Sequence, residues 1–111
     1  MKCYYKLYLS EDLISEKEKL IQKLNADEFQ IGKYIVALTK SKHHLEIYHS
    51  ILLIQKSISK NNVLVVGIAN RYEDAIKLVE KITQEVYDKT KGTDIKRYIF
   101  EMQQEFEEGN V

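Results

Sequence analysis

Two short runs of consecutive apolar residues constrain the fold of this chain more than any other feature. They are YIVAL at 34–38 and VLVVGIA at 63–69. Successive side chains of a β-strand point to opposite faces of its sheet, so a strand without polar alternation is buried on both faces. Either the helices divide between the two faces, or they cover one face and a second copy of the protein covers the other.

The opening residues supply a further strand and the first helix. Residues 2–9 alternate with the period of a strand, with one face formed by Cys3, Tyr5, Leu7 and Leu9 and the other by Tyr4, Lys6 and Tyr8. Ser10 then stands where a helix N-cap belongs, and Glu11 and Asp12 place negative charge in the first turn. We therefore predict a helix over 11–25.

The segment 43–59 carries two patterns at once. As a strand, it places Leu45, Ile47, Ile51 and Leu53 on one face, which His49 interrupts. As a helix, it repeats apolar residues at Ile47, Ile51, Ile54 and Ile58. We favour a strand antiparallel to residues 33–39, because isoleucine is common in strands and TKSKHH can connect neighbouring strands. The helical alternative would give a three-stranded parallel α/β sheet.

The C-terminal half predicts two helices. Residues 71–90 carry an apolar stripe, Gly92 follows as a C-cap, and Asp94 or Thr93 begins a last helix over 94–107. The chain is thus expected to form a single α+β domain over 1–111, with a mixed sheet of about four strands and three helices in the order β-α-β-β-β-α-α. The last helix would pack on the core or in a dimer interface.

The stretch VVGIANRYEDA has the strand–turn–helix layout of many phosphate sites. Phosphate cradles use several glycines, whereas this turn has Gly67 alone. Asn70 is a favoured N-cap, and Glu73 would complete a capping box. We interpret the corner as structural. The alternative is a small-molecule or anion site formed by Gly67, Asn70 and Arg71.

No pattern predicts catalysis, a metal or a cofactor. His43, His44 and His49 do not converge on one point in either a strand or a helix. Cys3 has no neighbouring histidine in the sequence to lower its pKa, and it shares a face with core residues of its strand. We therefore expect no catalytic residue, no bound metal and no cofactor.

Charge and cysteine content bear on location and partners. Basic and acidic residues both number 17, so no net field draws the chain to nucleic acid or anionic lipid. The apolar runs are too short to span a membrane. With one cysteine and no signal-peptide pattern, we expect a cytoplasmic protein without membrane contact.

A basic stretch could still bind single-stranded nucleic acid weakly. It is formed by Lys33, Lys40, Lys42, Lys56 and Lys60 with Tyr34 and Tyr48.

These observations favour a small non-enzymatic binding or assembly module that forms a homodimer. Tyrosine and methionine recur at interfaces, which makes candidates of Tyr4, Tyr8, Ile99, Met102 and Phe106. The acidic end near 101–108 would then meet the basic 33–60 region of the partner and set its orientation. The alternative function is a ligand-binding, possibly enzymatic domain that uses the corner at 67–71, and a nucleic-acid binder is the third.

Overall fold

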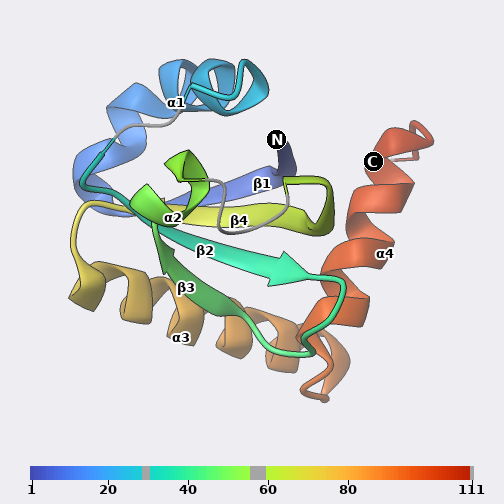
Figure 1. Cartoon of the computed structure of the whole chain (residues 1–111). Helices are drawn as coiled ribbons and strands as arrows, with labels where there is room; N and C mark the ends of the chain where they lie inside the picture. The colour runs from blue at the N-terminus through green and yellow to red at the C-terminus, as the bar shows by residue number, and fades with distance from the viewer. Residues whose placement is uncertain (29–30, 56–59, 111) are drawn as a thin grey trace.

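Four strands form one mixed sheet between helices (Figure 1). The computed structural model describes residues 1–28, 31–55 and 60–110. The strands are β1 (Lys2–Leu9), β2 (Tyr34–Thr39), β3 (Glu46–His49) and β4 (Val63–Ala69), in the spatial order β1-β4-β2-β3. β1 is parallel to β4, and β2 is antiparallel to both β4 and β3. The predicted α+β fold is confirmed, and the parallel three-stranded alternative is wrong.

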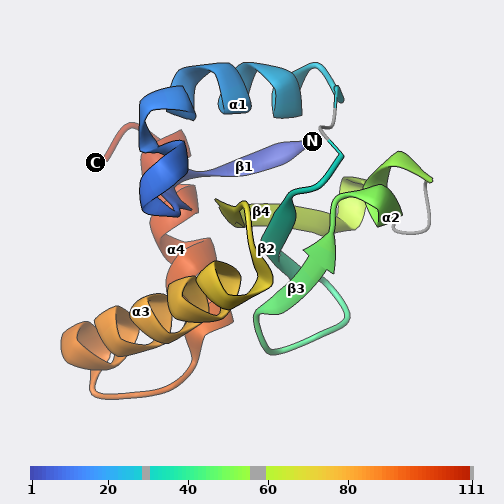
Figure 2. The same cartoon turned by 90° about the vertical axis from the view of Figure 1, so that its left-hand side faces the viewer.

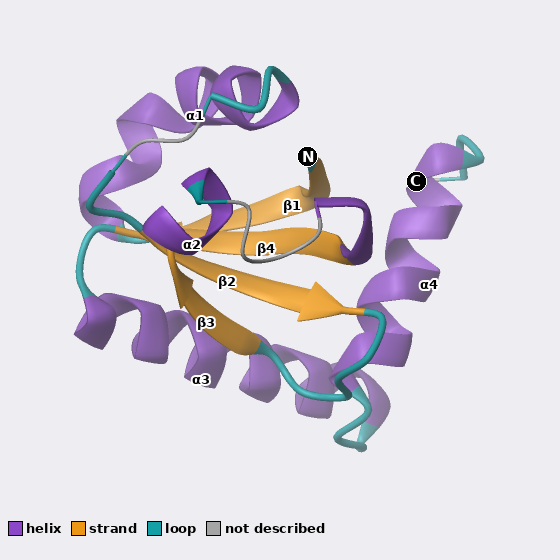
Figure 3. Cartoon of the chain, in the orientation of Figure 1, coloured by secondary structure: helices purple, strands orange, loops and turns teal. Residues whose placement is uncertain are grey.

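The helices divide between the two faces of the sheet (Figures 2 and 3). The 3₁₀-helix η1 (Glu11–Glu16), α1 (Lys17–Asn25) and α2 (Ile51–Ile54) pack on one face, and α3 (Tyr72–Thr90) and α4 (Ile95–Glu107) pack on the other. A short 3₁₀-helix, η2 (Lys60–Asn62), leads into β4. Of the two arrangements expected for strands that are apolar on both faces, the one with divided helices is therefore observed.

β4 is the most enclosed strand, because all seven of its residues are buried. Leu64 and Val66 face the cluster under α3 and α4, whereas Val63, Val65 and Ile68 face the cluster under α1 and α2. This explains why the sequence of the strand shows no polar alternation. Among the helices of the described residues, none combines the length and the apolar character that a membrane span requires.

The segment with two patterns contains both kinds of structure. β3 ends at His49, and α2 begins at Ile51, so the strand and the helix follow one another. The chain changes from strand to helix at Ser50. The Ser50 backbone is in the right-handed helical region, while its N–H still donates to the Lys33 carbonyl oxygen at 2.9 Å. Ile47 and Ile51 therefore do not share one strand face. The rest of this prediction, at 56–59, lies outside the described residues.

β1 departs from simple alternation at its centre. Its register against β4 shifts between Cys3 and Tyr8, which indicates a bulge. As a result Tyr5 packs with Tyr4 on the side of α4, where its ring stacks on Phe106 with 4.6 Å between ring centroids. The prediction that Tyr5 shares a face with Cys3 and Leu7 is therefore wrong.

The ends of the C-terminal helices agree only in part with the sequence prediction. Asp94 caps α4, since its side chain accepts the Arg97 N–H at 3.2 Å. The residue with left-handed backbone after α3 is Lys91, with φ 58°, and not Gly92. The Thr90 hydroxyl accepts the Gly92 N–H at 3.1 Å and so holds the turn around Lys91.

Candidate functional site

The predicted corner lies where β1 and β4 end side by side. The two strands are parallel neighbours, so their carboxyl ends meet at the same end of the sheet. The helices that follow them pack on opposite faces, α1 on one and α3 on the other. Ligands of open α/β sheets commonly bind at such a point, in the crevice outside the strand ends. The position of the corner is therefore that of a binding site, and its side chains decide whether it acts as one.

Asn70 does not cap α3. The N-cap of this helix is Arg71, which makes no side-chain capping hydrogen bond. The Asn70 side-chain amide instead donates to Asp12 Oδ2 at 2.5 Å, and the Ser10 hydroxyl donates to Asp12 Oδ1 at 2.7 Å. These hydrogen bonds, first that of Asn70 and then that of Ser10, lower the pKa of Asp12. The capping prediction is wrong because the turn after β4 brings the Asn70 side chain to the carboxylate of Asp12, which follows β1.

The groove beside this corner has a volume of about 730 Å³. It is lined by Leu9, Ser10, Glu11, Asp12, Arg71, Asp74, Lys77, Leu78 and Lys81. Arg71 is already engaged, because its Nε lies 3.2 Å from Asp74 Oδ2. Gly67 does not line the groove; it lies in β4, where a Cβ would sit 3.2 Å from both Leu78 Cδ1 and the Tyr8 carbonyl oxygen. Close packing accounts for this glycine.

The remaining sequence candidates for chemistry are separated in space. His43 and His44 are exposed after β2, whereas His49 packs edge-on against Tyr34 and accepts the Ile51 N–H at Nδ1. Burial raises the pKa of the Cys3 thiol to about 11, so the thiolate nucleophile is scarce at neutral pH. Throughout 1–28, 31–55 and 60–110, no three His, Cys, Asp or Glu side chains are grouped so that they could hold a metal ion.

Most of the residues proposed for a dimer interface pack in or against one core cluster of the chain itself. Tyr4 and Ile99 are core residues, 3% and 1% exposed. Tyr8 is partly buried and donates its hydroxyl to Glu85. Met102 packs against the same cluster, and the exposed Phe106 stacks on Tyr5.

The acidic end and the basic stretch proposed to meet in a dimer do not form two compact patches of opposite charge. In the acidic end, Glu107 pairs with Lys2 at 2.8 Å and Glu101 with Arg97 at 2.9 Å, both within the chain. In the basic stretch, Lys33 precedes β2 and Lys40 follows it, so they lie at opposite ends of that strand.

The outer edge of β3 and the adjacent flank of α3 form a surface that the sequence did not indicate. Tyr34 is the centre of an aromatic group there, with ring centroids 5.1 Å from His49 and 5.7 Å from Tyr72. Tyr72 is 51% exposed, and Ile76, one turn further along the same face of α3, is 38% exposed. The sequence predicted a strand here from Leu45 and Ile47, but not that this strand lies at an edge of the sheet.

The two edges of the sheet differ in how they are covered. At the β1 edge, the Tyr5 N–H donates to Gln103 Oε1 of α4 at 2.9 Å, so a helix side chain occupies the strand's outer side. At the other edge, within the described part of the chain, β3 pairs with β2 alone. An edge strand with unpaired backbone groups is a template for a further strand.

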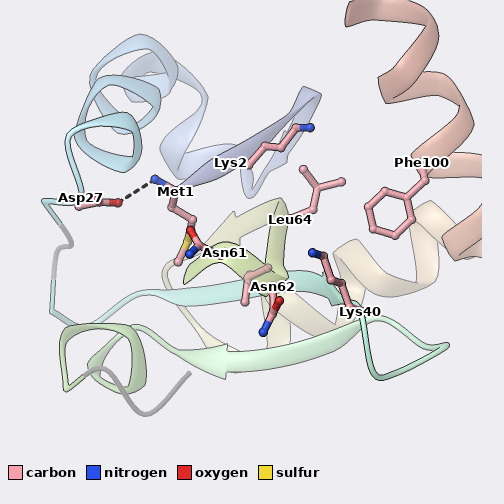
Figure 4. A pocket seen from close by; sticks show the side chains of 9 residues that line it. Met1, Lys2, Asp27, Lys40, Asn61, Asn62, Leu64 and Phe100 are labelled. Carbon is pink, nitrogen blue, oxygen red and sulfur yellow. Dashed lines mark hydrogen bonds and ion pairs between the residues drawn. The ribbon is translucent and has the colours of Figure 1, made fainter. Parts of the chain in front are cut away.

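A second pocket, of about 500 Å³, lies at the opposite end of the sheet from the corner (Figure 4). It is lined by Met1, Lys2, Asp27, Lys40, Asn61, Asn62, Val63, Leu64 and Phe100. These residues come from the N-terminal residue, β1, the α1–β2 connection, the residue after β2, η2, β4 and α4. No spacing in the sequence connects Phe100 with Lys40 or the two asparagines, and only the fold brings them together.

Comparison of the chain with protein-family models, with curated proteins and with solved structures found no match.

Proposed function

We propose that the protein is a small, cytoplasmic, non-enzymatic assembly module whose partner is a second copy of the same chain. The observation that carries this proposal is the open edge of β3 beside the exposed aromatic flank of α3. A dimer joined through a face of the sheet is no longer proposed, because the chain's own helices cover both faces. The edge of β3 takes its place. It also explains exposed apolar side chains that the fold itself leaves without cover.

The backbone of β3 presents its hydrogen-bonding groups in a defined pattern. Backbone groups of successive strand residues point alternately to the two sides of the strand. Ser50 donates its N–H to Lys33, and the register pairs Tyr48 with Ile35 and Glu46 with Ala37. Tyr48 and Glu46 therefore direct their backbone groups toward β2. Ile47 and His49 direct theirs outward, where a strand from another chain can pair with them.

A two-fold axis through Ile47 would join two such edges into one eight-stranded sheet. The Ile47 residues of the two copies would then exchange both backbone hydrogen bonds. Glu46 would lie opposite the partner's Tyr48, whose hydroxyl can donate to that carboxylate. Burial raises the pKa of Tyr48, so this hydroxyl keeps its proton at neutral pH.

The same axis would place the α3 helices of both copies on one face of the joined sheet. Their Tyr72 and Ile76 side chains would then approach one another across the axis. Tyrosine is enriched at protein interfaces because it combines a large apolar ring with a hydroxyl. This added contact matters, because a strand of only four residues gives few backbone hydrogen bonds by itself.

Sedimentation velocity across the micromolar range tests the proposal with a matched pair of variants. Ile76→Lys places a charge in the proposed interface, whereas Ile14→Lys places the same charge on η1, at a position 59% exposed on the other side of the sheet. We expect wild type and Ile14→Lys to dimerise and Ile76→Lys to remain monomeric. A wild-type protein that stays monomeric at every concentration would refute the proposal, as would equal dimerisation of both variants.

A further inference from the structure

The pocket at the far end of the sheet combines a free cation, two amides and an exposed aromatic ring (Figure 4). We propose that it binds a nucleoside monophosphate, with the base stacked on Phe100 and the phosphate held by Lys40. Its volume of about 500 Å³ falls within the range of about 300–1,000 Å³ that is usual for small-molecule sites. The site is separate from the β3 edge, so it does not depend on the assembly proposal.

Lys40 is the cation that the pocket leaves available. Lys2 also lines the pocket, but its ammonium is 2.8 Å from Glu107, and Asp27 lies 2.7 Å from the amino group of Met1. Within the described part of the chain, the Lys40 ammonium pairs with no side chain, and Figure 4 shows it directed into the pocket. An ammonium group binds phosphate as a compact charge, without the planar geometry that arginine requires.

Lys96 of α4 fixes this cation relative to the ring. Its ammonium donates to the carbonyl oxygens of Lys40 and Lys42, each at 2.9 Å, and so holds the turn after β2 against α4. The same ammonium lies 6.0 Å from the centroid of the Phe100 ring. The pocket therefore has a second positive charge close to the ring.

The ring and the amides match the other half of a nucleotide. Phe100 is 37% exposed and, in Figure 4, points from α4 toward Leu64 over the pocket. A base can stack on such a ring regardless of its identity. Asn61 and Asn62 are exposed, and their side chains make no hydrogen bond to any residue that the structure describes. Each amide offers donors and an acceptor, which is the complement of a base edge.

Calorimetric titration and amide NMR with the probes AMP, GMP, CMP and UMP test the site, with adenosine and inorganic phosphate as its two halves. We expect nucleotides to bind with a dissociation constant below about 1 mM and more tightly than either half. The amide signals of Leu64 and Val63 should shift. Phe100→Ala should weaken nucleotide binding about tenfold while leaving phosphate binding unchanged, and Lys40→Gln should weaken the binding of both.

The controls are Tyr87→Ala, which removes an exposed ring from α3, and Lys19→Gln, which removes an exposed charge from α1. Both should bind AMP like the wild type, and circular dichroism should show that all four variants are folded. Three results would each overturn the proposal: no nucleotide binding, an equal loss in Tyr87→Ala and Phe100→Ala, or shifts confined to the groove at Asp12 and Arg71. Tighter binding of a single-stranded oligonucleotide than of any mononucleotide would also overturn it, in favour of a nucleic-acid surface.

Discussion

The side-chain amide of Asn70 donates to the carboxylate of Asp12 across 2.5 Å and so joins the connection after β4 to the connection after β1. These two strands are neighbours, but their connections lead to opposite faces of the sheet. The hydrogen bond therefore links the two connections at the place where the chain leaves the sheet toward α1 on one face and α3 on the other. It takes the place of the helix cap that the sequence indicated.

The first prediction concerns this hydrogen bond. Asn70→Ala should lower the midpoint of urea unfolding, and this effect should nearly vanish in an Asp12→Ala background, because the two side chains act as one unit. A double-mutant cycle measures it. If Asn70 acted as a helix cap instead, its replacement would destabilise both backgrounds equally.

The same contact should make stability depend on acid pH. The pKa of Asp12 is lower in the folded protein, chiefly through Asn70. Its contribution is therefore complete above the unfolded pKa, which is about 3.9 for aspartate, and is lost as the pH falls through the lower folded pKa. Asn70→Ala should flatten this part of the profile of unfolding free energy against pH, and an unchanged slope would contradict the assignment.

The second prediction concerns the only glycine of β4. Gly67→Ala adds a Cβ that would lie 3.2 Å from Leu78 Cδ1 and from the Tyr8 carbonyl oxygen, and the latter is backbone that cannot move freely. We expect a loss of about 1–3 kcal/mol in unfolding free energy. Gly92→Ala is the matched control, since its Cβ would have its nearest neighbour at 3.6 Å. Equal effects in urea titrations would show that close packing does not explain Gly67.

The third prediction concerns the reactivity of Cys3. Burial raises the pKa of its thiol to about 11, whereas an unperturbed thiol has a pKa of about 8.5. At pH 8 the native protein should therefore react with an aromatic disulfide reagent far more slowly than the urea-unfolded chain. Stopped-flow absorbance gives both rates. A native rate close to the unfolded rate would mean that the thiol is accessible and easily ionised.

The fourth prediction distinguishes the two sides of β3. Proline removes a backbone N–H and is tolerated in edge strands where that N–H faces outward. Ile47→Pro should therefore keep the fold and abolish dimerisation, whereas Tyr48→Pro should destabilise the monomer because its N–H points toward β2. Circular dichroism and sedimentation velocity report the two effects. Similar behaviour of both variants would show that the alternation of the strand was assigned incorrectly.

How far the sequence predicted the fold depends on whether the determining contacts are local. β4 and α3 were predicted almost to the residue, because burial on both faces and a helical apolar stripe are properties of the segments themselves. The change from β3 to α2 at Ser50 was not, because the contact of Ser50 with Lys33 supports it from another segment. The bulge in β1 was not predicted either, and the Tyr5 N–H within it donates to Gln103, which is distant in sequence.

The same distinction applies to the candidate sites. The corner at Gly67, Asn70 and Arg71 was visible as a sequence motif, but its hydrogen bonds were not, since Asp12 comes from another strand connection. The pocket with Lys40 and Phe100 has no sequence motif at all, because its lining residues are brought together only when α4 packs against the sheet. Sequence patterns thus located a turn, whereas the groups available to a ligand came from the tertiary structure.

The position of β4 between β1 and β2 has a kinetic consequence. The β2–β3 pair is local and can form early. Among the described residues, however, β1 pairs with β4 alone, so Lys2 cannot pair until Leu64 is available. Contacts between residues far apart in sequence slow folding, because the chain loses the conformational entropy of the long loop before the strand pairing stabilises it. During synthesis on the ribosome, β1 therefore remains an unpaired strand until β4 has emerged, and in that interval the nascent chain is open to chaperones and to aggregation.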